Sequence, residues 1–234
     1  MFRKTADTGG TAMRKIGILG LVGVLALILA GCGGGDDHPV FTEFIDSNLS
    51  VDADITRDLG TGTVGAPILA SNTGNVLAGV TVDTGGTSVA DTRGFLNFPL
   101  SAIPLNASIR FASVKVFLNQ VTLRSPLFPS PFFIDLINTV TFPPPIVSAD
   151  YSAPFAATRS FDFLNTDQGF SVEIEVTSLM VEAQNLSLPS FEVRLGFDND
   201  AFLADPNTTR GLIEIDDGAS ALSQRPLLRV EFVN

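Results

Sequence analysis

Residues that most catalytic and metal sites require are nearly missing from this sequence, which has one Cys, one His, one Tyr and no Trp among 234 residues. A lone Cys excludes a disulfide framework. Together with a lone His it also excludes a zinc finger, a Cys/His metal cluster and a c-type haem site. Basic residues are scarce, with 14 Lys and Arg against 25 Asp and Glu. The net charge of −11 argues against nucleic acid, which binds to basic surfaces.

Apolar residues, in contrast, are plentiful. Hydrophobic residues make up 45% of the chain and charged residues 17%. Such a chain can bury a core, which excludes wholesale disorder. Its length allows one β-sandwich or barrel, or two small domains.

The N-terminal segment is organised like a signal peptide. Arg14 and Lys15 form a short basic region, and the uncharged stretch from Ile16 to Ala30 follows. Its 15 residues suit the apolar region of a signal peptide and are too few for a spanning helix, which needs about 20. We predict that residues 1–31 are a signal helix that is removed. Because residues 1–12 are polar, Met13 is the expected start.

Leu29-Ala30-Gly31-Cys32 ends this stretch and resembles the lipobox of bacterial lipoproteins. The resemblance implies cleavage between Gly31 and Cys32, transfer of diacylglycerol to the Cys32 thiol, and acylation of the new amino terminus by palmitate or a similar chain. One acyl chain is a marginal anchor at ~0.8 kcal/mol per buried CH₂, so two or more make a stable one. The alternative is an uncleaved signal anchor in which Cys32 has no role.

After residue 31 the chain keeps ten basic and 24 acidic residues, a net charge of −14. Residues 32–45 are predicted to be the lipidated Cys and a flexible tether, because they begin with Gly33-Gly34-Gly35-Asp36-Asp37. The tether also holds His38. A Ser-His-Asp or Cys-His nucleophile needs a firmly held imidazole, so both are excluded. By resemblance to enterobacterial sorting, Gly33 after the lipidated Cys favours the outer membrane of the cell envelope.

Residues 46–234 are predicted to form one all-β domain, an antiparallel, jelly-roll-like β-sandwich with one short helix. Strict alternation of apolar and polar residues marks strands at 96–100, 170–176, 191–197 and 228–232. Further strands are expected at 49–55, 76–82, 159–164, 211–216 and along 109–123, where the phase slips near Asn119 and Gln120 and predicts a bulge or turn. The predicted core is Leu96, Phe98, Leu100, Val114, Val116, Val172, Ile174, Val176, Val193, Leu195, Val230 and Phe232.

Two other segments have distinctive composition. The short helix is expected from Ser178 to Leu186, ending before Pro189. Residues 124–158 hold seven of the 14 prolines and several Phe, and read as a Pro/Phe-rich insertion. We expect a long connection that covers an open edge or end of the sandwich; the alternative is an exposed apolar surface for a partner or lipid. Within it, 132–142 could form one more strand or a helical turn.

Several blocks of the sequence follow one family pattern in order and spacing, from about residue 76 to the end. They are Arg93-Gly94-Phe95-Leu96-Asn97-Phe98-Pro99-Leu100-Ser101-Ala102-Ile103-Pro104, then Ala107-Ser108-Ile109 and Ala112-Ser113-Val114-Lys115-Val116, the Val172 to Leu179 segment, the Phe191 to Phe197 segment and the Pro226 to Phe232 segment. Together they resemble the DNRLRE-type β-sandwich domains. The resemblance implies a sandwich like that of carbohydrate-binding modules, found in secreted and surface proteins beside polysaccharide-degrading domains. These blocks form the fold and say little about activity.

Carboxylates are the only residues that could carry catalysis or bind a metal. Glu173 and Glu175 share the outward face of one strand, where paired carboxylates could hydrolyse a glycan but where Glu is also ordinary. Asp198, Asp200 and Asp216, with Asp205 and Asp217, could place loop oxygens around Ca²⁺. A second, weaker cluster is Asp52, Asp54 and Asp58. The alternative for both clusters is turn chemistry. No other cofactor is expected.

A literal G-x-G-x-x-G at residues 60–65 is interpreted as a loop, because Pro67 blocks the helix that a dinucleotide site requires. The leading hypothesis is a non-catalytic envelope lipoprotein whose sandwich binds an envelope or extracellular polymer or a protein. A purely structural envelope component and a carboxylate-based glycan-active enzyme are the alternatives. With no Trp and only Tyr151, an aromatic platform for sugars is improbable. Any glycan ligand is therefore expected to be neutral, or bound only with calcium.

Overall fold

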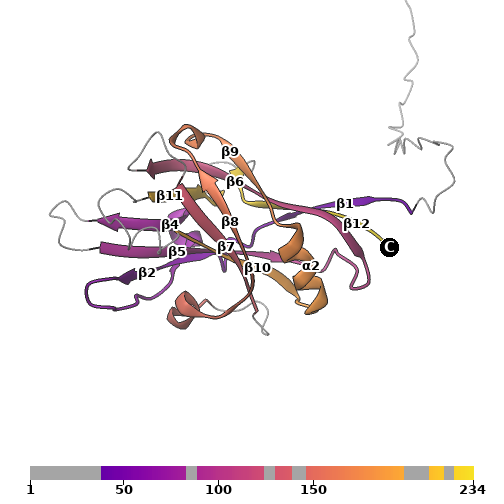
Figure 1. Cartoon of the computed structure of the whole chain (residues 1–234), viewed down its shortest axis with the longest axis horizontal. Helices are drawn as coiled ribbons and strands as arrows, with labels where there is room; N and C mark the ends of the chain where they lie inside the picture. Colours follow the sequence, from indigo (N-terminus) through magenta and orange to yellow (C-terminus); the bar gives the residue numbers. More distant parts are fainter. Residues whose placement is uncertain (1–37, 83–88, 124–129, 139–145, 198–210, 219–223) are drawn as a thin grey trace, which may run out of the picture. The chain divides into compact units, whose positions relative to one another are not determined.

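The computed structural model describes residues 38–82, 89–123, 130–138, 146–197, 211–218 and 224–234 (Figure 1). The signal segment, Gly31 and Cys32 lie outside the described residues, so the structure does not test the predicted cleavage and lipidation. His38–Asn234 forms one compact unit. Among the described residues, no helix is both long enough and apolar enough to cross a membrane.

The unit is built almost wholly of strands. The elements in chain order are β1 Phe41–Asp46, β2 Ala53–Asp58, β3 Ile68–Leu69, α1 Ala70–Thr73, β4 Asn75–Val82, β5 Val89–Pro99, β6 Ser108–Leu123, β7 Ser130–Ile137, the 3₁₀ turn η1 Ser148–Ser152, β8 Phe155–Phe163, the 3₁₀ turn η2 Asn165–Asp167, β9 Ser171–Glu175, α2 Thr177–Asn185, β10 Ser190–Phe197, β11 Gly211–Asp216 and β12 Leu227–Val233. The all-β prediction is confirmed, and the predicted short helix corresponds to α2.

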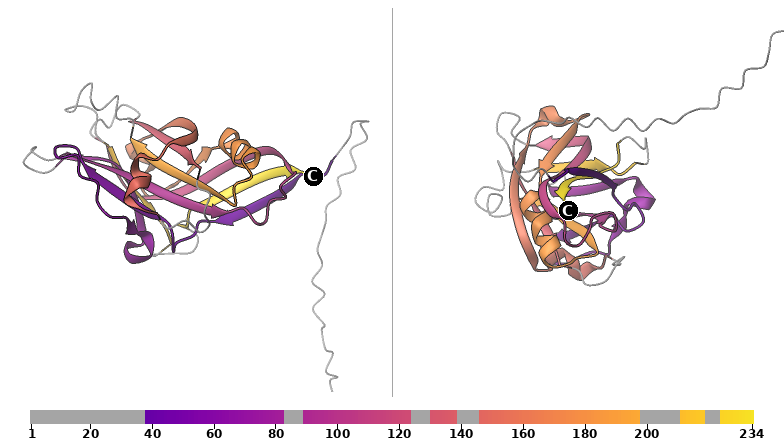
Figure 2. Two further views of the ribbon diagram at one scale, coloured as in Figure 1. Left: turned by 90° about the horizontal axis from the view of Figure 1, so that it is seen from below. Right: turned by 90° about the vertical axis from the view of Figure 1, so that its right-hand side faces the viewer.

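The strands of the described residues belong to one antiparallel sheet in the order β1-β12-β6-β11-β4-β5-β10-β7-β8, with β2 and β3 joined through β5 and β9 joined to β6. The sheet curls so that its two halves face each other, as the end-on view in Figure 2 shows, and the fold is sandwich-like. The long strand β5 links the halves, since its first part pairs with β4 and its second part with β10.

Gly94 marks the point where β5 passes from one half to the other. A Cβ atom at this position would lie 2.7 Å from Val76 Cγ1 and 2.9 Å from the carbonyl oxygen of Leu77. Only glycine lets β4 cross this closely. The first block of the family resemblance therefore contains a residue that the curled sheet requires.

The core lies between the two halves of the sheet and contains 11 of the 12 predicted core residues. Val172 is only half-buried and packs against the rim of the core. α2 adds Leu179, Met180 and Ala183 to it. The predicted irregularity in 109–123 is also confirmed: β11 pairs with Gln120 and then with Leu118, so Asn119 is bulged out.

Four predicted boundaries need correction. The strand expected at 96–100 is the end of β5, which begins seven residues earlier at Val89. β1 lies inside the stretch assigned to the tether, because Ile45 enters the core and the strand pairs with β12 along its whole length. As an edge strand it lacks regular alternation, which hid it in the sequence. The strand expected at 49–55 is β2, which begins at Ala53, because Asn48 to Asp52 form a hydrogen-bonded turn. β8 begins four residues earlier than expected.

The Pro/Phe-rich stretch contributes directly to the sheet. β7 lies between β10 and β8 and pairs with both, and Phe132 packs edge-on against Phe163 and Phe197 at ring distances of 5.1 and 5.3 Å. Downstream, Ile146 and Tyr151 close a second, smaller core with Ala53, Ile55 and Phe95. Several apolar residues of this stretch are thus buried in the core, whereas Val147 and Phe155 are about half exposed.

Candidate functional site

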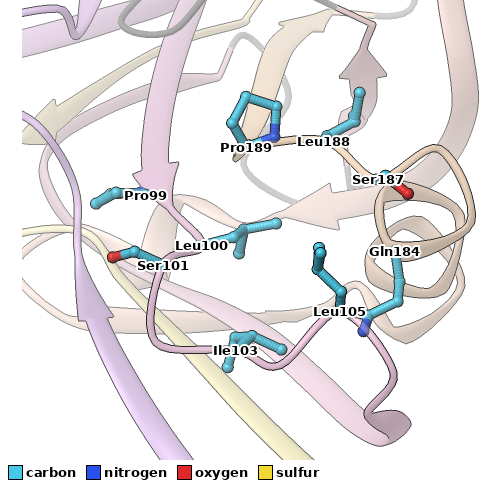
Figure 3. Close-up of a pocket in the computed structure, with 9 residues that line it drawn as sticks. All are labelled: Pro99, Leu100, Ser101, Ile103, Leu105, Gln184, Ser187, Leu188 and Pro189. Carbon is cyan, nitrogen blue, oxygen red and sulfur yellow. The ribbon is translucent and has the colours of Figure 1, made fainter.

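A pocket of about 430 Å³ lies between the connection that follows β5 and the turn that follows α2 (Figure 3). The connection is folded by two turns, in which the Ile103 amide donates to the Leu100 carbonyl at 2.9 Å and the Ala107 amide to the Pro104 carbonyl at 3.0 Å. Gln184 of α2 holds it in place, donating to the carbonyls of Pro104 at 2.7 Å and Ala107 at 3.3 Å.

The opposite wall of the pocket is the turn from α2 into β10. Ser187 adopts a left-handed conformation with φ of 54°, which reverses the chain so that Leu188 faces the core. The wall is joined to the connection by a hydrogen bond from the Leu100 amide to the Pro189 carbonyl at 3.0 Å. Both walls are therefore fixed, and the pocket is a built feature of the fold.

The lining of the pocket is apolar apart from two serines and Gln184, and it contains no titratable side chain. Its residues are Pro99, Leu100, Ser101, Ile103, Leu105, Gln184, Ser187, Leu188 and Pro189. General acid–base or nucleophilic chemistry needs an ionisable or activated group, which this lining lacks. The pocket is therefore a small apolar hollow with three polar side chains in its lining.

Tyr151, the candidate sugar-stacking residue, is only 2% exposed. Its hydroxyl donates to Asp91 Oδ2 at 2.5 Å, and the guanidinium of Arg93 lies 4.3 Å from its ring centroid. Burial and the neighbouring Asp91 carboxylate raise the pKa of the phenol. Because the ring is covered, Tyr151 cannot stack on a sugar.

Arg194 anchors the segment that carries Tyr151. Its side chain is 4% exposed, and its Nε and Nη2 atoms donate to Asp135 Oδ2 at 3.1 and 2.6 Å. Its Nη1 atom donates to the carbonyls of Asp150, Tyr151 and Ala153 at 2.9 to 3.2 Å. This cluster could not be predicted from the sequence. A charged residue in a strand is ordinarily solvated, and the residues next to Arg194 in the sequence do not indicate that it is buried.

Asp52 and Asp217 form a buried carboxyl pair, each with no exposed surface. Asp52 Oδ1 accepts from the Asn97 amide at 2.7 Å, and Asp217 Oδ1 accepts from the Ser47 hydroxyl at 2.9 Å. Burial and the charge of Asp217 raise the pKa of Asp52 well above its usual value, and burial raises the pKa of Asp217 to about 6. The pair lies inside the protein and serves the fold.

Of the three predicted calcium ligands, the described residues include only Asp216. Asp198 and Asp200, with Asp205, lie outside the described residues. Asp216 is buried, and its Oδ1 accepts from the Gly218 amide at 2.7 Å, which is turn chemistry.

The second cluster is not a metal site. Asp52 is paired with Asp217, Asp54 accepts from the Leu77 amide at 3.4 Å, and Asp58 caps a turn by accepting from the Thr61 amide at 2.8 Å. In the part of the chain that the structure describes, no three Asp, Glu, His or Cys side chains come together as metal ligands. These three aspartates are close together in the sequence, but each side chain has a different partner in the structure. The Asp58 turn also confirms that residues 60–65 form a loop.

Glu173 and Glu175 lie on β9 with partners of their own. Glu173 is exposed and accepts a hydrogen bond from Ser113 at 2.5 Å. Glu175 is half-buried, forms an ion pair with Arg159 of β8, and accepts from the Thr177 amide at 2.8 Å. The ion pair bridges two strands that are not paired to each other, so Glu175 links β9 to β8.

His38 is exposed at the start of the described residues. No family model matches the chain, and no curated protein matches it.

Proposed function

We propose that this protein is a non-catalytic lipoprotein of the bacterial cell envelope, held in the outer membrane by acyl chains on Cys32. The observation that carries the proposal is the lipobox at residues 29–32, followed within six residues by the start of a compact β unit at His38. A signal peptide, an acylated Cys, a short Gly/Asp tether and a folded domain form one consistent order along the chain.

The non-catalytic role is supported by what the polar side chains of the described residues do. Arg194, Asp135 and Tyr151 are used to fasten one segment, Asp52 and Asp217 are enclosed, and Glu175 bridges two strands. The pocket beside α2 is apolar and lacks an ionisable group. Binding and scaffolding are the activities that such a surface supports.

The domain is proposed to bind an envelope or extracellular polymer or a protein partner, as the resemblance to DNRLRE-type sandwiches implies. Because the mature chain carries a charge of −14, binding of an acidic polysaccharide is opposed unless a cation screens the charge. A neutral glycan or a protein is the better partner. A purely structural envelope component is the competing proposal.

Fractionation of cells tests the anchor, since C32A should move the protein from the membrane to the soluble fraction with its fold intact. Binding is tested with the purified protein on a glycan array, with and without calcium, and by pull-down from membranes. A glycan or protein captured by the wild-type domain supports the binding role. Retention of C32A in the membrane after signal cleavage would contradict the proposed anchor.

A further inference from the structure

Three chain segments meet at one end of the sheet. The register places Phe41 of β1 beside Phe232 of β12, and Val233 of β12 beside Ser108 of β6. The connection 100–107 runs directly into Ser108 and so lies at the same end, together with the pocket that it lines. In Figure 1 the start of β1, the C-terminus and α2 are all in the right-hand half of the drawing.

This end is rich in exposed apolar side chains. Leu105 is 78% exposed, Val40 59% and Phe41 41%, although the Phe41 ring also stacks on Phe232 at 5.7 Å. No charged residue occurs from Pro99 to Ile109. Arg110 follows and is exposed at the rim of this end. An apolar tip with a basic residue at its edge is the composition of a surface that enters the headgroup and acyl boundary of a bilayer.

The length of chain before the described unit indicates what covers this end. Five residues separate Cys32 from His38. Fully extended, they allow a span of only about 20 Å. If acyl chains hold Cys32 in the membrane, the end of the domain that carries His38 and Val40 stays within roughly that distance of the lipid surface. A partner of another kind would have to fit in this narrow space.

We propose that this end of the domain rests on the bilayer that holds the anchor, with Leu105, Val40 and Phe41 inserted at the lipid–water boundary. The proposal rests on the lipid anchor at Cys32 proposed above. The contact is apolar in origin, because Asp36 and Asp37 in the tether and the charge of −14 oppose attraction to anionic lipid. The opposite end of the sheet then faces away from the membrane.

The absence of Trp makes a direct test possible, because L105W introduces a single indole. The matched control is F170W. Phe170 is also exposed, at 65%, and its carbonyl accepts from the Leu118 amide, ten residues along β6 from Ser108. At the rise of a strand this places it about 33 Å from the proposed contact. The acylated full-length variants are reconstituted in phosphatidylethanolamine/phosphatidylglycerol vesicles with or without brominated acyl chains.

We expect brominated lipid to remove roughly half of the L105W fluorescence, with a shift of emission to the blue, and to leave F170W nearly unchanged. Equal quenching, or none for L105W in protein whose mass shows acylated Cys32, overturns the contact and leaves the anchor standing. A blue shift of L105W without vesicles means that a second copy or protein covers this end and also overturns it. Unacylated Cys32 instead refutes the proposed function.

Hydrogen exchange provides the same test without an introduced Trp. Amides of 100–107 should exchange more slowly in the vesicle-bound protein than in detergent-free C32A protein. Amides next to Phe170 should exchange equally in both. Unchanged exchange at 100–107 contradicts the proposal.

Discussion

Asp52 and Asp217 form a carboxyl pair that is fully buried in the interior of the domain. Each uses Oδ1 to accept a hydrogen bond, from Asn97 and Ser47 respectively, and the Oδ2 atom of each has no donor of its own. Burial and the repulsion between neighbouring carboxylates both disfavour the ionised form, so the pKa of each carboxyl is raised. For Asp52, burial is the larger cause and the charge of Asp217 adds to it.

This pair makes stability depend on pH in a defined direction. The folded pKa of Asp217 is about 6 and that of Asp52 is also raised, while both are near 3.8 in the unfolded chain. The native state therefore binds more protons than the unfolded state above pH 4. The stabilisation is fully present below about pH 4 and is lost as the pH rises through about 6. Asp54, whose pKa burial raises to about 6, acts in the same direction.

We predict that D52N flattens this dependence. The side-chain oxygen of an Asn at position 52 can still accept from the Asn97 amide, and its NH₂ group can donate to Asp217 at any pH. The variant should be more stable than the wild type at pH 7.5 by on the order of 1–3 kcal/mol, and its advantage should shrink toward pH 4.5. Urea unfolding at both pH values measures this. D58N, at an exposed turn, is the control and should leave the slope unchanged; a D52N slope equal to that of the wild type contradicts the pair.

Removal of the Tyr151 hydroxyl tests whether its hydrogen bond to Asp91 holds the η1 segment against β5. Y151F leaves the ring under Arg93 and removes its hydrogen bond to the buried Asp91. We expect a loss of about 1–3 kcal/mol in the free energy of unfolding. F155L, at a half-exposed Phe of the same stretch, should change it by about 0.5 kcal/mol or less. Equal effects of both substitutions would show that Tyr151 does not fasten the segment.

Gly94→Ala tests the place where β5 changes partners. The added methyl group meets Val76 and the backbone of Leu77, neither of which can move without shifting β4. The variant should lose about 1–3 kcal/mol or fail to fold. Gly65→Ala is the matched control, since its Cβ would lie 3.4 Å from the Thr56 carbonyl, an ordinary contact. Thermal midpoints of the two variants compare them directly, and a G94A midpoint equal to that of the control would refute the close crossing.

Adjacent residues of β9 test the register. Ile174 is 4% exposed, so I174A should cost about 2–5 kcal/mol. Glu173 points outward and only accepts from Ser113, so E173A should cost about 1 kcal/mol or less. Denaturant midpoints in both variants provide the measurement. The reverse order would place β9 one residue out of register.

The sequence predicted the regular strands well because their alternation is a local property. β12 has one face in the core, and its apolar residues appear at every second position. β10 shows the same alternation in its sequence, although both of its faces are buried. The bulge at Asn119 was also visible, since an extra residue changes the phase of the pattern. β1 was missed because an edge strand with exposed Phe44 is buried on neither face along most of its length.

The site could not be predicted in the same way, because its contacts join distant segments. Arg194 meets Asp135 and the carbonyls around Tyr151 only after β7 and β10 pair. Asp52 meets Asp217 across most of the chain, so grouping aspartates by sequence proximity led to the wrong cluster. The uncharged run from Pro99 to Ile109 was visible in the sequence, but that Leu105 is exposed follows only from the tertiary structure.

The intact mass of the protein extracted from membranes tests the central claim, anchoring through Cys32. Anchoring through Cys32 predicts a chain that begins at Cys32 and carries a diacylglyceryl group and an amide-linked acyl chain. The mass of C32A should lack both additions. A mature chain that retains residues before Cys32, or that begins there without acyl groups, would contradict it.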